Sequence, residues 1–252
     1  MSQRGRAFVS AILELGLGTV RVDSECEPRV ALLSHPPINI IGGDVGAAEE
    51  SGILEEFPQG NLLIVPSEAW ESSLRNVWGD DLKSNPRTRL SGDHLSTRQL
   101  KKLKRPLPQG FDLKRLDSDL LERADPNMKE HVSMFWNSPE HFLTKGFGFC
   151  ITRDERVVSM ASTFFPFVHD FEIQVDTVDS VEYRRKGFAT AACVALLEHG
   201  LENGLVPCWD AANEASVKIA LKLGYANPDP YKAYFRWRTP SPDGAATQAP
   251  SA

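Results

Sequence analysis

The sequence predicts an α/β fold in which a mixed sheet, mostly antiparallel and parallel near its centre, follows an N-terminal α+β domain. Residues 109–238 are predicted to run strand, two helices, three strands, helix, strand, helix, strand, an order typical of helices packed on a sheet. Residues 1–105 show short apolar runs separated by glycine and proline. Pro106 and Pro108 lie between the two patterns and favour a domain boundary there, because proline interrupts regular structure.

The N-terminal domain is predicted to combine helices with short strands. Apolar residues at helical spacing predict an amphipathic helix over residues 8–15. Residues 29–43 and 60–67 predict short strands and turns, since glycine and proline flank their apolar runs. Residues 67–79 predict another helix, with Ser67 as its N-cap.

A basic segment, residues 96–105, ends this domain. It allows two interpretations: a strip that binds phosphate or an acidic partner, or a solvated helix face that leads into a linker. The second is favoured, because runs of charge are usually solvated. The basic residues are Arg98, Lys101, Lys102, Lys104 and Arg105.

The C-terminal domain shows regular alternation and helical spacing. Its predicted strands cover residues 110–117, 146–154, 156–167, 170–178, 206–211 and 231–237. Its predicted helices cover residues 118–136, 138–146, 187–203 and 214–224. Residues 239–252 contain no bulky apolar residue, so a disordered tail is expected there.

The composition excludes some classes of protein. The 252 residues are 41% hydrophobic and 25% charged, as in a soluble globular protein. A net charge of -6 argues against nucleic acid as the partner, which would require a basic excess. Arg4 and Arg6 precede a short apolar run that Glu14 interrupts, which predicts an amphipathic helix rather than a signal peptide or membrane span.

Cysteine and histidine spacing predicts no metal site. Cys26, Cys150, Cys193 and Cys208 are too far apart in sequence for a zinc knuckle or a redox pair. Such scattered cysteines are typical of reduced thiols in a cytoplasmic protein, and a single nucleophilic cysteine is the alternative.

One segment places positive charge directly before an apolar helix. Arg184, Arg185 and Lys186 precede Gly187, where the predicted helix begins. The first turn of a helix has N–H groups without intrahelical partners, and the helix dipole adds positive charge. Because glycine has no side chain to hold a ligand away, a pyrophosphate fits this place. The alternative is a charged loop that merely precedes a helix.

Two helices complete this region. The spacing of three and four in the first predicts one buried stripe, formed by Phe188, Ala192, Ala195, Leu196 and His199. The second is predicted to have Asn213 as its N-cap and Gly224 as the glycine that ends it.

These segments resemble two motifs of the GNAT (GCN5-related N-acetyltransferase) superfamily. The first motif is Arg or Gln, two residues, Gly, any residue, then Gly or Ala, and Arg184, Gly187 and Ala189 occupy these places. In the second motif, Asn begins a helix that ends in Leu-Gly-aromatic. The matching residues are Asn213, Ser216, Leu223, Gly224 and Tyr225. The layout is similar to a two-domain GNAT subgroup, in which residues 1–105 are either a degenerate copy of the fold or an unrelated cap.

The resemblance implies a fold in which two central parallel strands splay apart and acyl-CoA, expected to be acetyl-CoA, lies between them. The pantetheine would pair with the backbone of residues 178–180, and the amides of residues 185–190 would hold the pyrophosphate. The residues implied in binding the coenzyme are Val178, Asp179, Ser180, Arg184, Arg185, Lys186, Gly187, Phe188, Ala189, Thr190, Asn213 and Ser216.

The strand predicted over residues 170–178 has one acidic and one apolar face. Alternation places Glu172, Gln174 and Asp176 together. Either Glu172 or Asp176 would serve as the general base that deprotonates an amine. Alternatively, these carboxylates only shape a polar cleft for a cationic acceptor.

The expected activity is direct acetyl transfer from acetyl-CoA to the amine of a small molecule or protein. The superfamily's usual general acid, a tyrosine on the second-motif helix, is replaced by Ala220. An impaired GNAT fold that binds CoA as a sensor or scaffold is therefore the alternative. A dehydrogenase-like nucleotide binder is disfavoured, because the glycines lack GxGxxG spacing.

Overall fold

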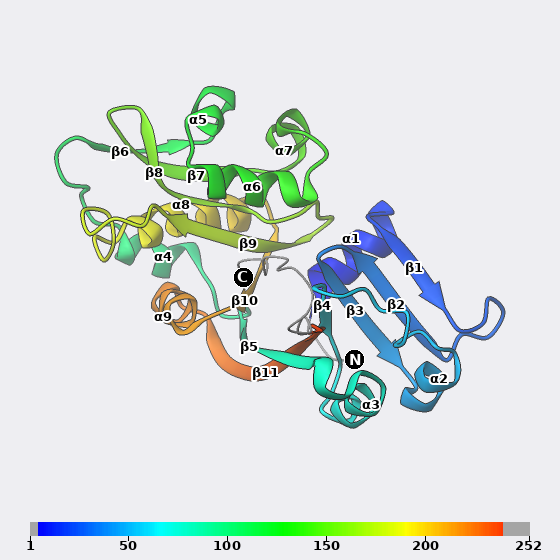
Figure 1. Cartoon of the computed structure of the whole chain (residues 1–252). Helices are drawn as coiled ribbons and strands as arrows, with labels where there is room; N and C mark the ends of the chain where they lie inside the picture. Colours follow the sequence, from blue (N-terminus) through cyan, green and yellow to red (C-terminus); the bar gives the residue numbers. More distant parts are fainter. Residues whose placement is uncertain (1–4, 239–252) are drawn as a thin grey trace, which may run out of the picture. The chain divides into compact units, whose positions relative to one another are not determined.

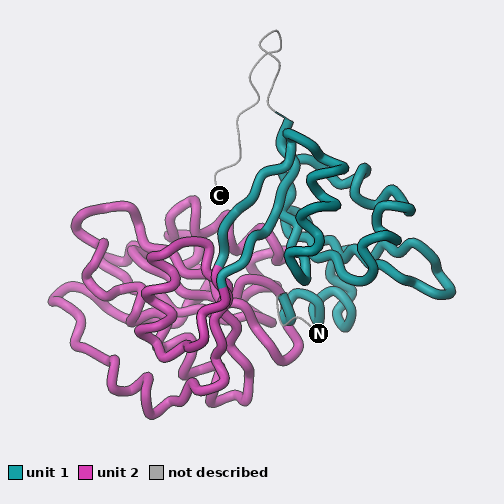
Figure 2. Tube along the Cα trace, turned by 90° about the horizontal axis from the view of Figure 1, so that it is seen from below, with its two compact units in different colours: residues 1–87, 230–252 teal, residues 88–229 magenta. Residues whose placement is uncertain are grey.

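The computed structural model describes residues 5–238 (Figure 1). The chain forms two compact units (Figure 2): unit 1 holds residues 5–87 and 230–238, and unit 2 holds residues 88–229. The expected disordered tail, residues 239–252, lies outside the described residues.

The two units divide the chain at positions other than the sequence predicts. The sequence places the boundary between residues 105 and 109, whereas the units divide at Arg87 and again at Pro230. Helix α4 (Thr97–Leu103) accounts for the difference, because its Leu100 is fully buried in the main core of unit 2. The basic segment therefore packs with the domain that follows it.

Unit 1 is a mixed sheet with helices packed on it. Its strands lie in the order β1-β2-β3-β4-β11, in which only β3 and β4 run parallel. Trp70, Leu74 and Tyr234 lie in its core. Its elements are α1 (Arg6–Leu15), β1 (Thr19–Val22), β2 (Val30–His35), β3 (Ile38–Gly43), α2 (Val45–Glu50), β4 (Leu62–Ile64), α3 (Ala69–Trp78), the 3-10 helix η1 (Gly79–Asp81), the start of β5 (Leu82–Ser91) and the end of β11 (Ala226–Arg236).

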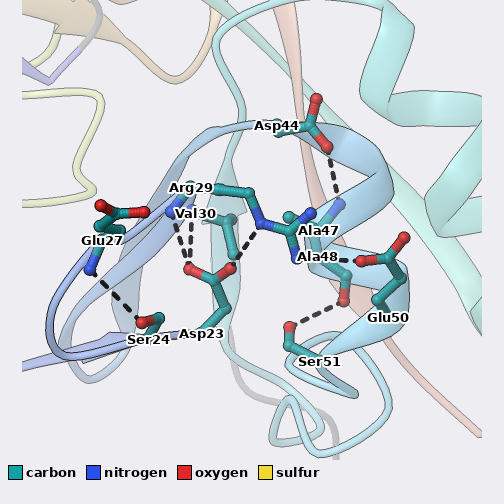
Figure 3. A network of polar contacts seen from close by, with 10 residues as sticks. All are labelled: Asp23, Ser24, Glu27, Arg29, Val30, Asp44, Ala47, Ala48, Glu50 and Ser51. Carbon is teal, nitrogen blue, oxygen red and sulfur yellow. Dashed lines mark hydrogen bonds and ion pairs between the residues drawn. The ribbon is translucent and has the colours of Figure 1, made fainter.

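A buried carboxylate organises the connection between β1 and β2 (Figure 3). Asp23 accepts hydrogen bonds from the backbone N–H groups of Arg29 and Val30, at 2.9 and 3.1 Å. The Arg29 guanidinium contacts Asp23 at 3.2 Å and Glu50 of α2 at 2.9 Å. Asp44 then caps α2 by accepting from the Ala47 N–H at 2.7 Å. The loop is thereby joined to the helix that follows the hairpin.

The predictions for unit 1 are partly confirmed. The helices predicted over residues 8–15 and 67–79 are α1 and α3. The predicted cap of α3 was wrong, because Glu68, not Ser67, is the N-cap and makes no side-chain capping bond. The sequence did not predict β1 or α2, which are too short for a periodic pattern to stand out.

Unit 2 contains a sheet in the order β5-β10-β9-β8-β7-β6. Only the β9–β10 pair is parallel, as the sequence predicts for the centre of the sheet. Besides α4, its elements are the end of β5 (Leu82–Ser91), β6 (Phe111–Arg115), α5 (Ser118–Glu122), α6 (Pro126–Phe135), α7 (Pro139–Lys145), β7 (Gly148–Arg153), β8 (Arg156–Thr163), β9 (Asp170–Thr177), α8 (Phe188–Glu202), β10 (Val206–Ala211), α9 (Glu214–Leu223) and the start of β11.

Each face of this sheet packs against different helices. Ile173 and Val175 of β9 pack in the core that holds α8, α9 and α4. Met160 of β8 and Val178 pack in the core that holds α5, α6 and α7. Alternate side chains of the central strands are therefore divided between the two helical layers.

Helix α8 is buried more widely than the predicted stripe. Cys193 and Leu197 are fully buried, although they lie outside the stripe, whereas Ala195 and His199 are only half-buried. The physical reason is that α4 packs on α8 in addition to the sheet. A helix with several packing partners has little exposed surface, so its periodicity is weak.

Strand β5 was not predicted. Its sequence, LKSNPRTRLS, is polar and contains Pro86, which argues against a paired strand. Within unit 2, only residues 88–90 pair with β10, beyond the proline.

Candidate functional site

The two parallel strands of unit 2 pair over only part of their length. The ladder between β9 and β10 ends at Glu172 and Cys208. Beyond these residues, β9 continues beside β8 as far as Thr177, whereas β10 pairs with β5 from Trp209 onward. The strands thus separate at Glu172, as the resemblance predicts for the acyl-CoA gap.

The edge of β9 along this gap carries open backbone groups. The Val178 N–H donates to the Val158 carbonyl at 3.0 Å, and the Glu172 carbonyl accepts from the Phe164 N–H at 2.9 Å. Even-numbered residues of β9 therefore bond to β8, and odd-numbered residues face the other way. Beyond the ladder with β10, the residues whose backbone groups face the gap are Val175 and Thr177. An extended chain with amide groups can pair with such an edge.

In the turn after β9, two of the three backbone N–H groups that are predicted to pair with pantetheine form hydrogen bonds within the protein. Val178 and Ser180 both donate within the protein, the Ser180 N–H to the Val178 carbonyl at 2.8 Å. No described residue accepts from the Asp179 N–H. Of these three amides, that of Asp179 is open to a ligand.

The loop before α8 presents a row of open amides. No described residue accepts a hydrogen bond from the backbone N–H groups of residues 185–190. Arg185 (φ 58°) and Gly187 (φ 85°) are left-handed, and the residues beside them are not, which makes successive N–H groups converge. A Cβ on Gly187 would meet no atom within 4 Å, so the space before the helix is open.

Positive charge surrounds these amides. The three basic residues before Gly187 are exposed, and the Arg184 guanidinium lies 2.9 Å from the Asp179 carboxylate. Lys222 of α9 donates to the Thr190 hydroxyl at 3.3 Å, which brings another cation to the first turn of α8. The sequence did not suggest Lys222, since it is not among the matched positions of the second motif.

The second motif forms the predicted cap of α9. The Asn213 carboxamide accepts from the Ser216 N–H at 2.9 Å, and Gly224 ends the helix at φ 109°. The Ser216 hydroxyl accepts from the Trp209 indole at 3.0 Å. The Asn213 carboxamide therefore caps α9, the Ser216 hydroxyl joins α9 to β10, and their contact with a coenzyme stays a prediction.

The acidic face of β9 exists as alternation predicts. Because Ile173 and Val175 pack against α8, Glu172 and Asp176 lie on the opposite face of the sheet. One carboxylate oxygen of Glu172 is shielded from solvent. The Asp176 carboxylate lies 3.0 Å from Nδ1 of His131, on α6.

The family model of the GNAT acetyltransferases matches residues 2–234, which span both units. The chain belongs to the GNAT acetyltransferase family. It is an N-acetyltransferase whose donor is an acyl-CoA.

Relatives match this GNAT protein over most of its length. The "Uncharacterized N-acetyltransferase YdfB" of Bacillus subtilis (strain 168) is 30% identical over 239 residues, 90% of this chain and 89% of that protein. A GCN5-related N-acetyltransferase-like protein from Streptococcus suis 89/1591 matches with a TM-score of 0.73 and 30% identity, over 88% of this chain and 89% of that one. A putative GNAT acetyltransferase from Novosphingobium aromaticivorans DSM 12444 shares the fold at a TM-score of 0.56 and 15% identity, over 93% and 97% of the two chains.

The tyrosine that often serves as general acid is absent from α9 of this GNAT protein. Ala220, at the corresponding position, is fully buried. Tyr225 lies nearby, but burial raises the pKa of its hydroxyl well above the usual value, and the hydroxyl faces the Pro207 carbonyl at 3.5 Å. Tyr225 is thus a core residue that packs on Trp209.

Sequence reasoning missed His131. It lies 45 positions from Asp176, outside both GNAT motifs, and no local pattern distinguishes it. Only the packing of α6 against β9 brings the two side chains together. The hydrogen bond to Asp176 raises the pKa of His131, against an opposing effect of burial.

Cys150 and Cys193 of this GNAT protein are poorly suited to act as nucleophiles. Burial raises the pKa of the Cys150 thiol to about 12 and raises that of Cys193 as well, which opposes thiolate formation. Within residues 5–238, no group of three or more metal-ligating side chains lies together. None of the helices over that range is both long and apolar enough to cross a membrane.

Proposed function

We propose that this GNAT protein transfers an acetyl group directly from acetyl-CoA to the amine of a cationic small molecule or protein. The observation that carries the proposal is the row of open amides over residues 185–190. Converging N–H groups at a helix N-terminus bind phosphate oxygens, because both the hydrogen bonds and the dipole favour negative charge.

The donor would lie in the gap between β9 and β10. With its diphosphate on the amides before α8, its pantetheine amides would pair with the β9 edge at Thr177 and Asp179. The thioester, one ethylene group beyond the second amide, would then lie along the β9 edge near Val175, between Thr177 and the place where the strands separate. This arrangement supports direct transfer, since donor and acceptor meet at one point.

The negative charge on one face of β9 indicates the kind of acceptor. Glu172 and Asp176 lie on one face of β9, and a negative face attracts a protonated amine. Attack on the thioester requires the neutral amine, so a group in this face must also accept a proton. The proposal therefore includes both a cationic acceptor and a general base on this side of the sheet.

Gly187→Asp tests the donor site. The substitution adds bulk and negative charge where the diphosphate would lie, and we expect it to weaken CoA binding by at least about 100-fold, measured by calorimetry. Gly110→Asp is a matched control, since Gly110 has the same φ of 85° and an added Cβ there also meets nothing within 4 Å. Equal affinity in both variants would overturn the proposed loop.

Turnover is tested by thiol release from acetyl-CoA with a panel of amines: a polyamine, an aminoglycoside, free amino acids and a lysine peptide. Release with one of them supports the proposal. CoA binding without release across the panel would instead support the sensor or scaffold. If saturating CoA does not raise the melting temperature, both hypotheses fail.

A further inference from the structure

A group of three polar side chains joins α6 to β9 on the acidic face. Nδ1 of His131 and Nε2 of Gln174 each lie 3.0 Å from Oδ2 of Asp176. The side chains of His131 and Asp176 retain 32% and 22% of their exposure, so a ligand can reach them. Neither GNAT motif accounts for this group.

The hydrogen bonds determine which ring nitrogen carries the proton. An ionised carboxylate only accepts, so Nδ1 of His131 must donate to Asp176. Nε2 of Gln174 donates to the same carboxylate oxygen and lies 3.1 Å from Nδ1 of His131. The hydrogen bond from Gln174 holds the carboxylate in place. In the neutral ring, Nε2 then keeps its lone pair, and no described residue forms a hydrogen bond with it. A histidine oriented in this way is prepared to accept a proton.

The group lies close to the proposed path of the donor. Asp176 shares its face of β9 with Glu172, where the strands separate, and its neighbour Thr177 faces the gap. An amine that approaches the thioester from this face would pass the half-buried ring of His131.

We infer that His131 is the general base of this acetyltransferase, with Asp176 and Gln174 as positioning residues; the inference rests on the proposed function. The amine nitrogen forms a bond to the thioester carbonyl carbon, and the C–S bond breaks. The proton of the amine goes to Nε2 of His131 and then, through solvent, to the leaving thiolate. The products are the amide and the free thiol, and the imidazole returns to its neutral form.

With His131 as the base, the rate of acetyl transfer depends on pH. Among the described residues, the charged groups that act on the ring are Asp176 on β9 and Glu130 on α6. Both raise the pKa of His131 above its ordinary value of about 6.5. Since the neutral ring is the base, kcat/KM rises with pH through this raised pKa. Removing the Asp176 charge lowers the pKa, so the ascending limb moves to lower pH.

The test compares pH profiles of kcat/KM with acetyl-CoA and the fastest amine of the panel. His131→Gln is expected to lower the plateau by about 100-fold or more and to abolish the limb. Asp176→Asn is expected to lower it by at least about tenfold and to shift the limb to lower pH. His169→Gln removes an exposed histidine as a matched control and should leave the profile unchanged.

Other outcomes overturn the inference. If Glu172 is the base, Glu172→Gln removes the limb and His131→Gln keeps it. An unmoved limb in Asp176→Asn likewise refutes the pairing, even if His131→Gln fails to fold. CoA affinity should stay within about twofold in the His131 and Asp176 variants. CoA affinity therefore separates the two hypotheses. If the wild-type protein does not bind CoA, the proposed function fails, whereas the inference alone fails if the wild-type protein binds CoA and the pH profiles do not change as expected.

Discussion

Asp23 shows how one carboxylate can hold a loop in unit 1. Its side chain is only 5% exposed, and its partners are two backbone N–H groups and the Arg29 guanidinium. The hydrogen bonds, the one from Val30 foremost, lower the pKa of Asp23 against the effect of burial. Because the folded-state pKa is depressed, the stabilisation is present above the unfolded-state pKa and is lost as pH falls through the folded-state value.

We therefore expect Asp23→Asn to lower the urea midpoint of unfolding at neutral pH. We also expect the midpoint of this variant to fall less steeply than that of the wild type as the pH is lowered. Urea midpoints measured between about pH 7 and pH 3 check this expectation. Glu25→Gln in the same loop is the control, since Glu25 is exposed. Parallel midpoint curves for the wild type and Asp23→Asn would refute the role of the carboxylate.

The two ends of α8 have different roles. Its first turn is slim and leaves its amides open, while its last turns pack tightly on the sheet. Gly200 lies in this tightly packed part, and a Cβ there would lie 2.7 Å from two carbons of the Phe171 ring. This glycine allows close approach of the helix and β9, although glycine weakens a helix.

We expect Gly200→Ala to destabilise the protein by about 1–2 kcal/mol, because an overpacking cost of roughly 1–3 kcal/mol exceeds a helix gain of about 0.5–1 kcal/mol. Urea unfolding measures the change. Phe171→Leu in the same background should restore part of the loss, since the clash is with the ring. If Gly200→Ala is more stable than the wild type, the ring moves aside freely.

For the whole molecule, the chain builds unit 1 from its two ends. Strand β11 pairs with β4 through Tyr234 and Phe235, and the Tyr234 hydroxyl donates to Glu71 of α3 at 2.9 Å. Tyr234 is 2% exposed in the core of unit 1. Unit 1 therefore depends on residues that follow unit 2 in the chain.

A chain that ends at Asp229 is accordingly expected to lose the fold of unit 1. Limited proteolysis should then cleave within residues 5–87, which we expect to resist cleavage in the wild type. A chain that ends at Arg238 is the control, because it keeps every described contact of β11. Equal protection of both truncated chains would show that unit 1 folds without this strand.

The elements that sequence reasoning predicted are those with long periodic patterns or strong end signals. Helix α8, strand β10 and the Asn213–Gly224 frame of α9 were predicted nearly to the residue, because capping and alternation are local properties. Strand β5 was missed, since pairing partners supply its strand character. The predicted N-cap of α3 was wrong by one residue.

The sequence by itself determined the family, the charged loop, the capped helix and the acidic face of β9, because each rests on residues within a few positions of one another. Only the tertiary structure decided where the ladder between β9 and β10 ends, which amides stay open and which histidine meets Asp176. Those properties depend on pairing and packing between segments far apart in the sequence, such as His131 and Asp176, which are 45 positions apart. A linear pattern carries no signal for such contacts.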